Sequence, residues 1–259
     1  MVSSRTIGSL ALIVLAGCTP AGDSTPAGDR TPASDTDPLS ATCEDAIECD
    51  RLVLGSQDEL ADAPLCRSIN GDFRLQYNGG DLTRIHDIGD TFRCLTHVTD
   101  EVTITSTNLT DLDGLSTLES VDLQLDVWGN ALMTSVELES LEFVGAGLQI
   151  MGNDALTHAS FPVLTTVNDT ETEGLGEALL EVEMNEQLTS LDFPALTEVW
   201  VLSVEQNDAI TDLSGLQSIE TAFRLTITSN PSLCTSVVDE FLEGVSTSDV
   251  EYNYGNNGC

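Results

Sequence analysis

One pattern recurs along this chain of 259 residues and constrains its fold more than any other feature: apolar, any residue, apolar, two residues, then asparagine. Its occurrences are Phe73/Leu75/Asn78, Leu125/Val127/Asn130, Leu148/Ile150/Asn153, Leu180/Val182/Asn185, Leu202/Val204/Asn207 and Leu225/Ile227/Asn230. Val102 and Ile104 match the apolar positions too, but Asn108 sits differently, four residues after Ile104 rather than three. Counted from Asn108, successive asparagines are 22, 23, 32, 22 and 23 residues apart. An interval of 22 to 23 residues predicts a solenoid in which each repeat forms one coil.

Within each repeat the apolar spacing changes from two to three. The alternation at Leu202 and Val204 predicts a short strand, and apolar residues then return every third position at Ile210, Leu213 and Leu216. That second spacing predicts turns or 3₁₀ segments, because too few residues remain for an α-helix of ordinary length. The asparagines are expected to line up at one corner, where their amides bond neighbouring backbone. A glycan or ion site along the same column is the alternative interpretation.

Several of these segments resemble known repeat families. Residues 111–121 (DLDGLSTLESV), 160–167 (SFPVLTTV), 192–199 (DFPALTEV) and 212–222 (DLSGLQSIETA) are similar to leucine-rich repeats and, more closely, to the coils of the receptor L-domain family. The carboxyl end, LTITSNPSLC followed by VEYNYGNNGC, resembles the closing cap of that family. The resemblance covers residues 71–259 and implies a mainly β fold, a right-handed parallel β-helix-like solenoid. The chain departs from the family in an insertion after Val167 and in its N-terminal region.

The amino-terminal residues are typical of an exported lipoprotein. Arg5 precedes a short apolar run that ends in Leu15-Ala16-Gly17-Cys18. The run is too short to span a bilayer as a helix, which favours a cleaved signal at 1–17. The last four residues resemble the lipobox of bacterial lipoproteins, which implies acylation of Cys18 and attachment to the membrane. An ordinary signal peptide with an incidental cysteine is the alternative.

The next residues define the remaining domain boundaries. Residues 18–42 are rich in Thr, Pro, Ser and Asp and predict a disordered tether behind the lipidated cysteine. We expect a disulfide-containing N-terminal cap and first coil at 43–98, and a solenoid with a closed C-terminal cap at 99–259. Thr19 stands where the lipoprotein class commonly has an inner-membrane retention Asp, so the resemblance implies the outer membrane in a cell that has one.

Six further cysteines predict disulfides, because an even number in an exported chain is typical of oxidised pairs. Cys234 and Cys259 are expected to pair and close the C-terminus. Four others can pair in three ways that the sequence leaves open: Cys43, Cys49, Cys66 and Cys94. The cysteine and histidine spacings do not favour a zinc site.

The charge narrows the classes of partner. The chain has 44 Asp and Glu against 8 basic residues, all Arg, and a net charge of −36. Nucleic acid and anionic lipid surfaces both require basic patches, so this balance argues against them. A salty habitat, divalent cations bridging surface carboxylates and a cationic partner each explain such acidity.

Strand alternation predicts two outward-facing columns on one sheet. The first contains Arg74, Thr103, Asp126, Gln149, Glu181, Ser203 and Thr226, and the second contains Gln76, Thr105, Trp128, Met151, Glu183, Glu205 and Thr228. An exposed Trp128 beside Met151 with acids around it favours a contact patch for a protein or carbohydrate. The candidate binding face comprises Asp126, Trp128, Gln149, Met151, Glu181, Glu183, Ser203 and Glu205. A solvated face with one incidental Trp is the alternative.

The insertion at 168–177 is the second candidate site, because insertions in solenoids form loops on one face. Its carboxylates suit Ca²⁺, although their spacing matches no EF-hand loop: Asp169, Glu171, Glu173 and Glu177. A solvated acidic loop without a metal is the alternative, and the sequence has no other cofactor motif.

No motif indicates catalysis. The sequence lacks GxSxG, HExxH and a phosphate-binding glycine loop, and no Arg or Lys lies between Cys94 and Arg224 to serve a uronate lyase. We therefore expect a monomeric, non-catalytic envelope lipoprotein that recognises a protein or carbohydrate ligand. The alternatives are a structural acidic envelope protein without a specific ligand and a glycan-active β-helix enzyme.

Overall fold

The computed structural model describes residues 42–79, 83–167, 179–251 and 255–256. Met1–Leu39 lies outside the described residues, and the description below concerns the unit Ser40–Cys259. This unit is mainly β, as the sequence predicts, and contains a parallel sheet of thirteen strands. The predicted signal and lipidation site, and the predicted tether apart from Thr42, lie outside the described residues.

The large sheet consists of strands two to eleven residues long. They are β1 (Ile47–Leu54), β2 (Cys66–Gln76), β3 (His97–Val98), β4 (Val102–Thr105), β5 (Ser120–Val121), β6 (Gln124–Trp128), β8 (Phe143–Val144), β9 (Gly147–Met151), β11 (Thr166–Val167), β12 (Leu179–Glu183), β14 (Glu198–Glu205), β15 (Thr221–Thr228) and β16 (Ser246–Glu251). A second sheet has three strands, β7 (Ser135–Glu137), β10 (His158–Ser160) and β13 (Ser190–Asp192).

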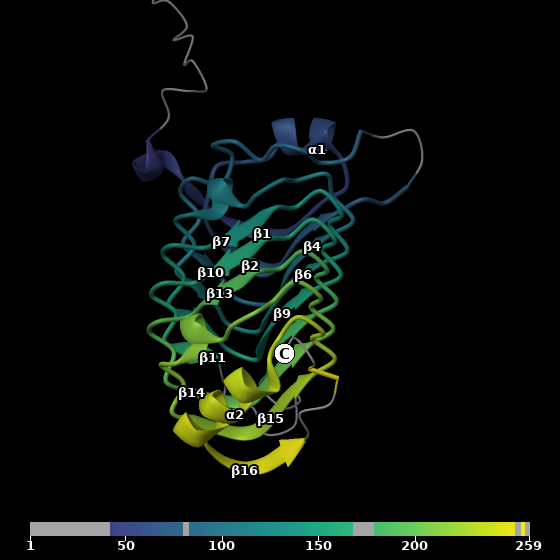
Figure 1. Ribbon diagram of the computed structural model, residues 1–259. Helices are drawn as coiled ribbons and strands as arrows, with labels where there is room; N and C mark the ends of the chain where they lie inside the picture. The colour runs from purple at the N-terminus through teal and green to yellow at the C-terminus, as the bar shows by residue number, and fades with distance from the viewer. Residues whose placement is uncertain (1–41, 80–82, 168–178, 252–254, 257–259) are drawn as a thin grey trace, which may run out of the picture. The chain divides into compact units, whose positions relative to one another are not determined.

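Two parallel ladders make up the large sheet. One runs through β4, β6, β9 and β12, and the other runs through β3, β5, β8 and β11. The long strands β2 and β14 pair with members of both ladders, so they join the two at either end. Figure 1 shows β4, β6 and β9 following one another in sequence order. Each strand thus pairs with the strand one repeat away, as the 22- to 23-residue interval requires.

The repeated apolar residues form one continuous core. In β6 and β9, Leu125 pairs with Leu148 and Val127 with Ile150, and all four side chains are buried. The residues at every third position after the asparagine are buried as well, including Ile210. Side chains from successive repeats therefore face a shared apolar interior, which is the burial that the sequence pattern predicts.

The segments after the asparagines take two forms. Turns of 3₁₀ type occur at η3 (Asp113–Leu115) and η4 (Ser214–Leu216), as expected. At η4, Asp212 Oδ1 accepts a hydrogen bond from Ser214 N–H at 3.0 Å, which fixes the turn. Gly215 is required there because a Cβ atom would overlap the carbonyl oxygen of Leu191.

The repeats between these turns instead contribute β7, β10 and β13, where the sequence predicts only turns. Their backbones pair in parallel through Val136, Ala159 and Leu191, which are buried, while the flanking residues point away from the core. These repeats lack the Asp-Leu-x-Gly-Leu sequence of the 3₁₀ turns. Extended backbone satisfies its hydrogen bonds with neighbouring repeats, so a second short sheet replaces the local turn.

Two helices contribute to the core near the ends of the sheet. The helix α1 (Gln57–Ala61) buries Leu60, and α2 (Thr235–Gly244) buries Val238 and Phe241. Figure 1 shows α2 close to β15 and β16, at the carboxyl-terminal end of the ladder. Among the described residues no helix is both long enough and apolar enough to cross a bilayer.

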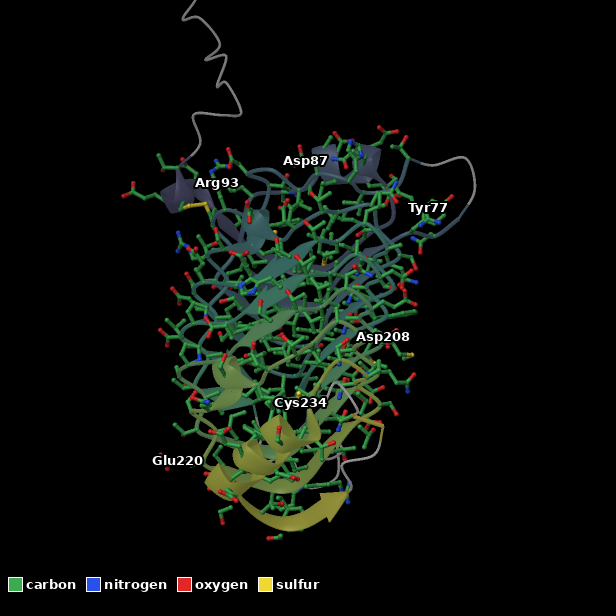
Figure 2. The ribbon with its side chains drawn as sticks, viewed as in Figure 1. Tyr77, Asp87, Arg93, Asp208, Glu220 and Cys234 are labelled. Carbon is green, nitrogen blue, oxygen red and sulfur yellow. A yellow bond between two sulfur atoms is a disulfide. The ribbon has the colours of Figure 1, made fainter. Side chains whose placement is uncertain are left out.

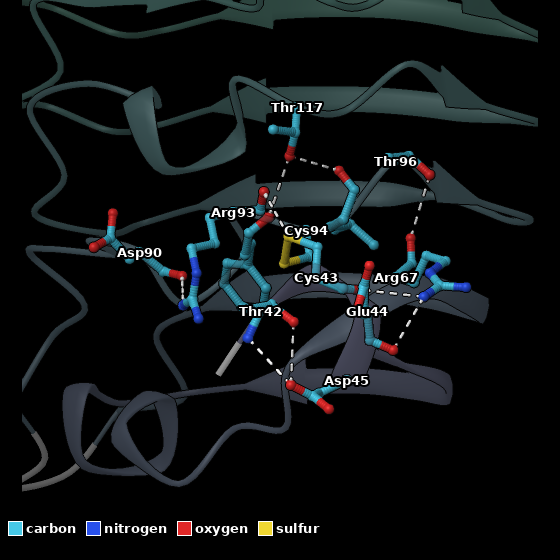
Figure 3. Close-up of a disulfide and its surroundings, with 12 residues drawn as sticks. Thr42, Cys43, Glu44, Asp45, Arg67, Asp90, Arg93, Cys94, Thr96 and Thr117 are labelled. Atoms are coloured by element: carbon cyan, nitrogen blue, oxygen red, sulfur yellow. Dashed lines mark hydrogen bonds between the residues drawn. A yellow bond between two sulfur atoms is a disulfide. The ribbon is translucent and has the colours of Figure 1, made fainter. Parts of the chain in front are cut away.

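The disulfides resolve the pairing that the sequence leaves open. Cys43 pairs with Cys94 and Cys49 with Cys66. Figure 3 shows Arg67 donating to the carbonyl oxygens of Cys43 and Glu44 beside the first of these disulfides, next to the 3₁₀ turn η2 (Cys43–Asp45).

Cys234 is disulfide-bonded too and lies just before α2 (Figure 2). Cys259 is outside the described residues, so the Cys234–Cys259 pairing stays a prediction.

Candidate functional site

The corner after each strand holds a buried column of polar side chains. The backbone N–H of each member donates to the side-chain oxygen of the next member at 2.9 to 3.1 Å. The column consists of Thr107, Asn130, Asn153, Asn185, Asn207, Asn230 and Asn256. Each asparagine Nδ2 also donates to a strand carbonyl of the preceding repeat at 2.7 to 3.0 Å.

This column, the asparagine ladder, is structural. Asn153 is 0% exposed and its amide is bonded on both sides, so no atom remains for a glycan or an ion. Asn256 extends the ladder by one repeat beyond the sequence pattern. The Gly-Asn pair at 255–256, which also occurs at 129–130 and 152–153, could have identified it.

Asn78 was expected in the column and is not part of it. Its side chain is exposed, and Thr107 takes the place that the next asparagine would occupy. Thr107 donates its hydroxyl to Asn130 Oδ1 at 2.8 Å and accepts from Leu109 N–H. It therefore offers no amide to the repeat before it, and the ladder ends there.

The residue before each ladder member has a left-handed backbone. The positive φ values, between 54° and 76°, belong to Ser106, Gly129, Gly152, Met184, Gln206, Ser229 and Gly255. Glycine adopts this conformation without strain, whereas other residues need roughly 1–2 kcal/mol. The ladder enforces the conformation even at Met184, where no glycine relieves it.

The outer face of the sheet lies next to this corner, and its register matches the sequence prediction. Trp128 pairs with Met151, Met151 with Glu183, and Glu183 with Glu205. The first predicted column is in register as well, from Arg74 to Thr226. All eight residues of the predicted binding face therefore occupy one surface.

Two members of the columns are buried rather than exposed. Ser203 is 7% exposed because its hydroxyl donates to Glu205 Oε1 at 2.8 Å and lies 3.4 Å from Glu183 Oε1. Thr105 is 2% exposed and lies between its strand partners Gln76 on β2 and Trp128 on β6. Their short side chains are covered by longer neighbours, an effect that alternation alone does not reveal.

A pocket of about 310 Å³ opens on this face. Trp128, 48% exposed, and Met151 come from paired strands, and Met184, 41% exposed, follows the next strand. The other lining residues are Gly129, Gln149 and Gly152. The two glycines occupy the left-handed corner where other repeats carry a side chain, so their missing side chains make the hollow.

Three carboxylates follow one another across β12 and β14 beside this pocket. Burial, a hydrogen bond with Glu181 and the charges of Glu181 and Glu205 raise the pKa of Glu183 from its ordinary 4.5 to about 7, against a smaller lowering by Ser203. Glu205 Oε2 accepts a hydrogen bond from the Thr228 hydroxyl at 2.8 Å. These like charges repel at neutral pH, and a bound cation would relieve that repulsion.

Asp126 lies on β6, on the other side of the pocket from these carboxylates. Burial and the charge of Glu101 raise the pKa of Asp126 from its ordinary 3.8 to about 6, against a smaller lowering by Arg74. Arg74 Nη2 lies 3.0 Å from Glu101 Oε2 and 3.2 Å from Asp72 Oδ2, so its charge is divided among acids. Asp126 Oδ1 is buried and has no hydrogen-bond partner among the described residues.

The second predicted site is outside the described residues. Asp169, Glu171, Glu173 and Glu177 all fall within 168–178, and so the expected cation loop stays a prediction. Within the described ranges no group of three or more His, Cys, Asp or Glu side chains has the arrangement of a metal site.

Two surface features escaped the sequence analysis. Trp200 and Phe223 stack at 4.3 Å with an interplanar angle of 7°, and each is 40% exposed. A second pocket, of about 600 Å³, is lined by loop residues that include His86 and Asp113. Trp200 sits where β14 extends across both ladders, outside the repeated strand pattern, so alternation gave no signal for it.

No protein-family model matches the chain, and neither the curated proteins nor the solved structures contain a match to it.

Proposed function

We propose that this protein is a non-catalytic lipoprotein of the cell envelope whose outer sheet face recognises a protein or carbohydrate ligand. The observation that carries the proposal is the apolar pocket of Trp128, Met151 and Met184 on an otherwise acidic face. An exposed indole beside two thioethers offers contact area that a purely solvated face does not need. Aromatic anchors of this kind commonly dominate binding energy.

The same proposal includes the architecture. Parallel pairing at a 22- to 23-residue offset, the asparagine ladder and the continuous core support a right-handed parallel β-helix-like solenoid of the receptor L-domain or leucine-rich-repeat type. Such a scaffold holds exposed side chains of successive strands about 4.8 Å apart, which suits a flat recognition surface.

The proposed location in the cell envelope rests on the amino-terminal leader sequence. Lipidation of Cys18 would attach the protein to a membrane, and the outer membrane follows from Thr19. Mass spectrometry of the amino-terminal peptide tests this, with a diacylglyceryl thioether on Cys18 as the expected result. Cys18→Ser should move the protein from the membrane pellet to the soluble fraction, and retention in the pellet would contradict lipid anchoring.

Glu183 gives the enzyme alternative its one specific support, because a carboxyl with a pKa of about 7 beside other carboxylates suits a general acid. Glycan turnover that Glu183→Gln abolishes would establish a glycan-active enzyme and refute the binding proposal. A structural role without ligand is the third candidate, supported by the disulfides and the ladder.

Replacement of Trp128 tests the proposal directly. The full chain with Cys18→Ser is immobilised and tested against envelope proteins and a glycan array, together with Trp128→Ala and Trp200→Ala. We expect Trp128→Ala to reduce retention of a specific ligand at least tenfold, about 1.4 kcal/mol, while Trp200→Ala retains it. Equal retention by all three proteins would favour the structural alternative.

A further inference from the structure

The sheet-face pocket has a chemistry that narrows the class of ligand. Its wall is apolar and aromatic, from Trp128, Met151 and Met184, while the adjoining strand carries Glu181 and Glu183. We propose, building on the proposed function, that the pocket receives the side chain of an arginine or lysine from a cationic partner protein.

The register places the two halves of this site together. Glu183 is the Cα partner of Met151, and Glu181 is the partner of Gln149, so both carboxylates lie one strand away from pocket residues. Strands in a sheet are about 4.8 Å apart. A side chain whose apolar stem lies against Met151 and Trp128 therefore has its charged end within reach of the two carboxylates.

The aromatic wall suits a cation as well. A guanidinium or ammonium group over an indole face is attracted by the ring, and Arg and Lys carry that group on a stem of methylenes. About 310 Å³ accommodates one such side chain and its stem. A neutral sugar would use the indole but would leave the repulsion between the carboxylates in place.

The charge of the whole chain favours the same occupant. The net charge is −36, and β9, β12 and β14 contribute only Glu181, Glu183 and Glu205 as titratable side chains on this part of the face. Opposite charges also accelerate the encounter between partners.

The corner geometry supports a role for Met184. Its φ of +54° is strained for a residue with a side chain, and the preceding two repeats have glycine at the same position. Ser106, Gln206 and Ser229 have the same conformation, so the asparagine ladder imposes it. Met184 differs from them because its side chain closes the third side of the pocket.

The test is a titration with a charge-matched pair of probes. The blocked tripeptides acetyl-Gly-Arg-Gly-amide and acetyl-Gly-citrulline-Gly-amide have nearly the same shape, and only the first is charged. The protein is the full chain with Cys18→Ser and Trp200→Phe, which leaves Trp128 as the single indole, since the chain has two Trp. The readout is the fluorescence of Trp128.

We expect the arginine peptide to bind about tenfold more tightly than the citrulline peptide. The double variant Glu181→Gln/Glu183→Gln should reduce arginine binding about fivefold, and Met184→Gly should reduce it by a similar factor. Gln206→Gly is the matched control, because it changes the same corner position away from the pocket and should leave binding unchanged.

The pH dependence adds a second readout. Glu183 faces Glu181 on its own strand and Glu205 and Ser203 on β14, and β9 opposes it with Met151. Because its pKa is about 7, arginine binding should strengthen between pH 6 and pH 8 and release protons. Glu183→Gln should remove this dependence.

Three outcomes would overturn the inference: equal binding of both peptides, no fluorescence change up to about 10 mM peptide, or arginine binding that neither Met184→Gly nor the double Gln variant reduces. These outcomes do not by themselves refute the proposed function. If the protein binds both peptides equally but binds a neutral sugar or a protein in a way that depends on Trp128, the recognition face stands and only the cationic ligand is rejected.

Discussion

Two columns of the same repeats follow opposite rules. At the corner, Asn153 and the other asparagines of the ladder are buried, and each bonds its neighbours in the column, with Thr107 in place of asparagine at the first position. On the outer face, at the ends of the same strands, the side chains change from Trp128 to Met151 to Glu183. The corner is uniform because it satisfies buried backbone groups, whereas the outer face is free to vary because water satisfies most of it.

The comparison teaches where to look for specificity in a repeated fold. Gly129 and Gly152 adopt the left-handed conformation of the corner without strain, and their missing side chains leave a hollow on the outer face. The same glycines therefore set both the backbone geometry and the shape of the surface. Figure 2 shows exposed acids such as Asp208 and Glu220 at the periphery of the described body.

The largest expected effect on stability comes from removing one side chain of the asparagine ladder. Asn153→Ala removes the acceptor of Asn130 N–H and the donor to the Val127 carbonyl, both buried. We expect the free energy of unfolding to fall by about 4 kcal/mol. Urea denaturation followed by circular dichroism measures it. Asn108→Ala, outside the ladder, is the control and should cost under about 1 kcal/mol; equal losses would show that the ladder has no special role.

The next effect has the opposite sign. Met184→Gly relieves the left-handed strain at +54° and should raise the free energy of unfolding by about 0.5–1 kcal/mol, because relief of strain exceeds the added entropy of the unfolded chain. Thermal unfolding detects this as a higher melting temperature. Gln206→Gly, with φ of +55°, should give a similar gain. A loss of stability at Met184 alone would mean that its side chain stabilises the corner by packing.

The smallest effect concerns charge on the outer face. Burial and neighbouring acids raise the folded-state pKa of Glu183 to about 7, above its ordinary 4.5, so the folded protein binds more protons than the unfolded chain between these values. Stability contributed by protonated Glu183 is therefore present below about pH 4.5 and lost as pH rises through 7.

Glu183→Gln should flatten that decline and stabilise the protein at pH 8. The change is under about 1 kcal/mol, since solvent screens a side chain this exposed. Denaturation midpoints at pH 5 and pH 8 give the comparison, with Glu186→Gln, an exposed acid, as control. An unchanged pH dependence in Glu183→Gln would assign the repulsion to Glu181 and Glu205 instead.

Much of the fold was accessible from the sequence because its rules are local. Alternation in Leu125 and Val127 predicts which side chains enter the core, and the recurring asparagine predicts the corner column. Both predictions are confirmed. The strands β7, β10 and β13 were missed, since whether a short segment forms a turn or pairs with neighbours depends on the adjacent repeats.

The candidate site was accessible only in part. The register of Trp128, Met151 and Glu183 follows from the repeat, and the structure confirms it. Met184 was missed because its role depends on a backbone angle that the ladder imposes. Ser203 was expected on the surface and is buried under the carboxylates of its neighbours.

By itself the sequence determined the interval of the repeat, the apolar interior and the acidic exterior, since each follows from the order of residues along one strand or turn. Only the tertiary structure decided that Cys43 bonds Cys94 and Cys49 bonds Cys66. It also decided that side chains from three repeats enclose one pocket and that the pKa of Glu183 is raised to about 7. These properties depend on distances between segments far apart in the chain, which the packing of the repeats sets.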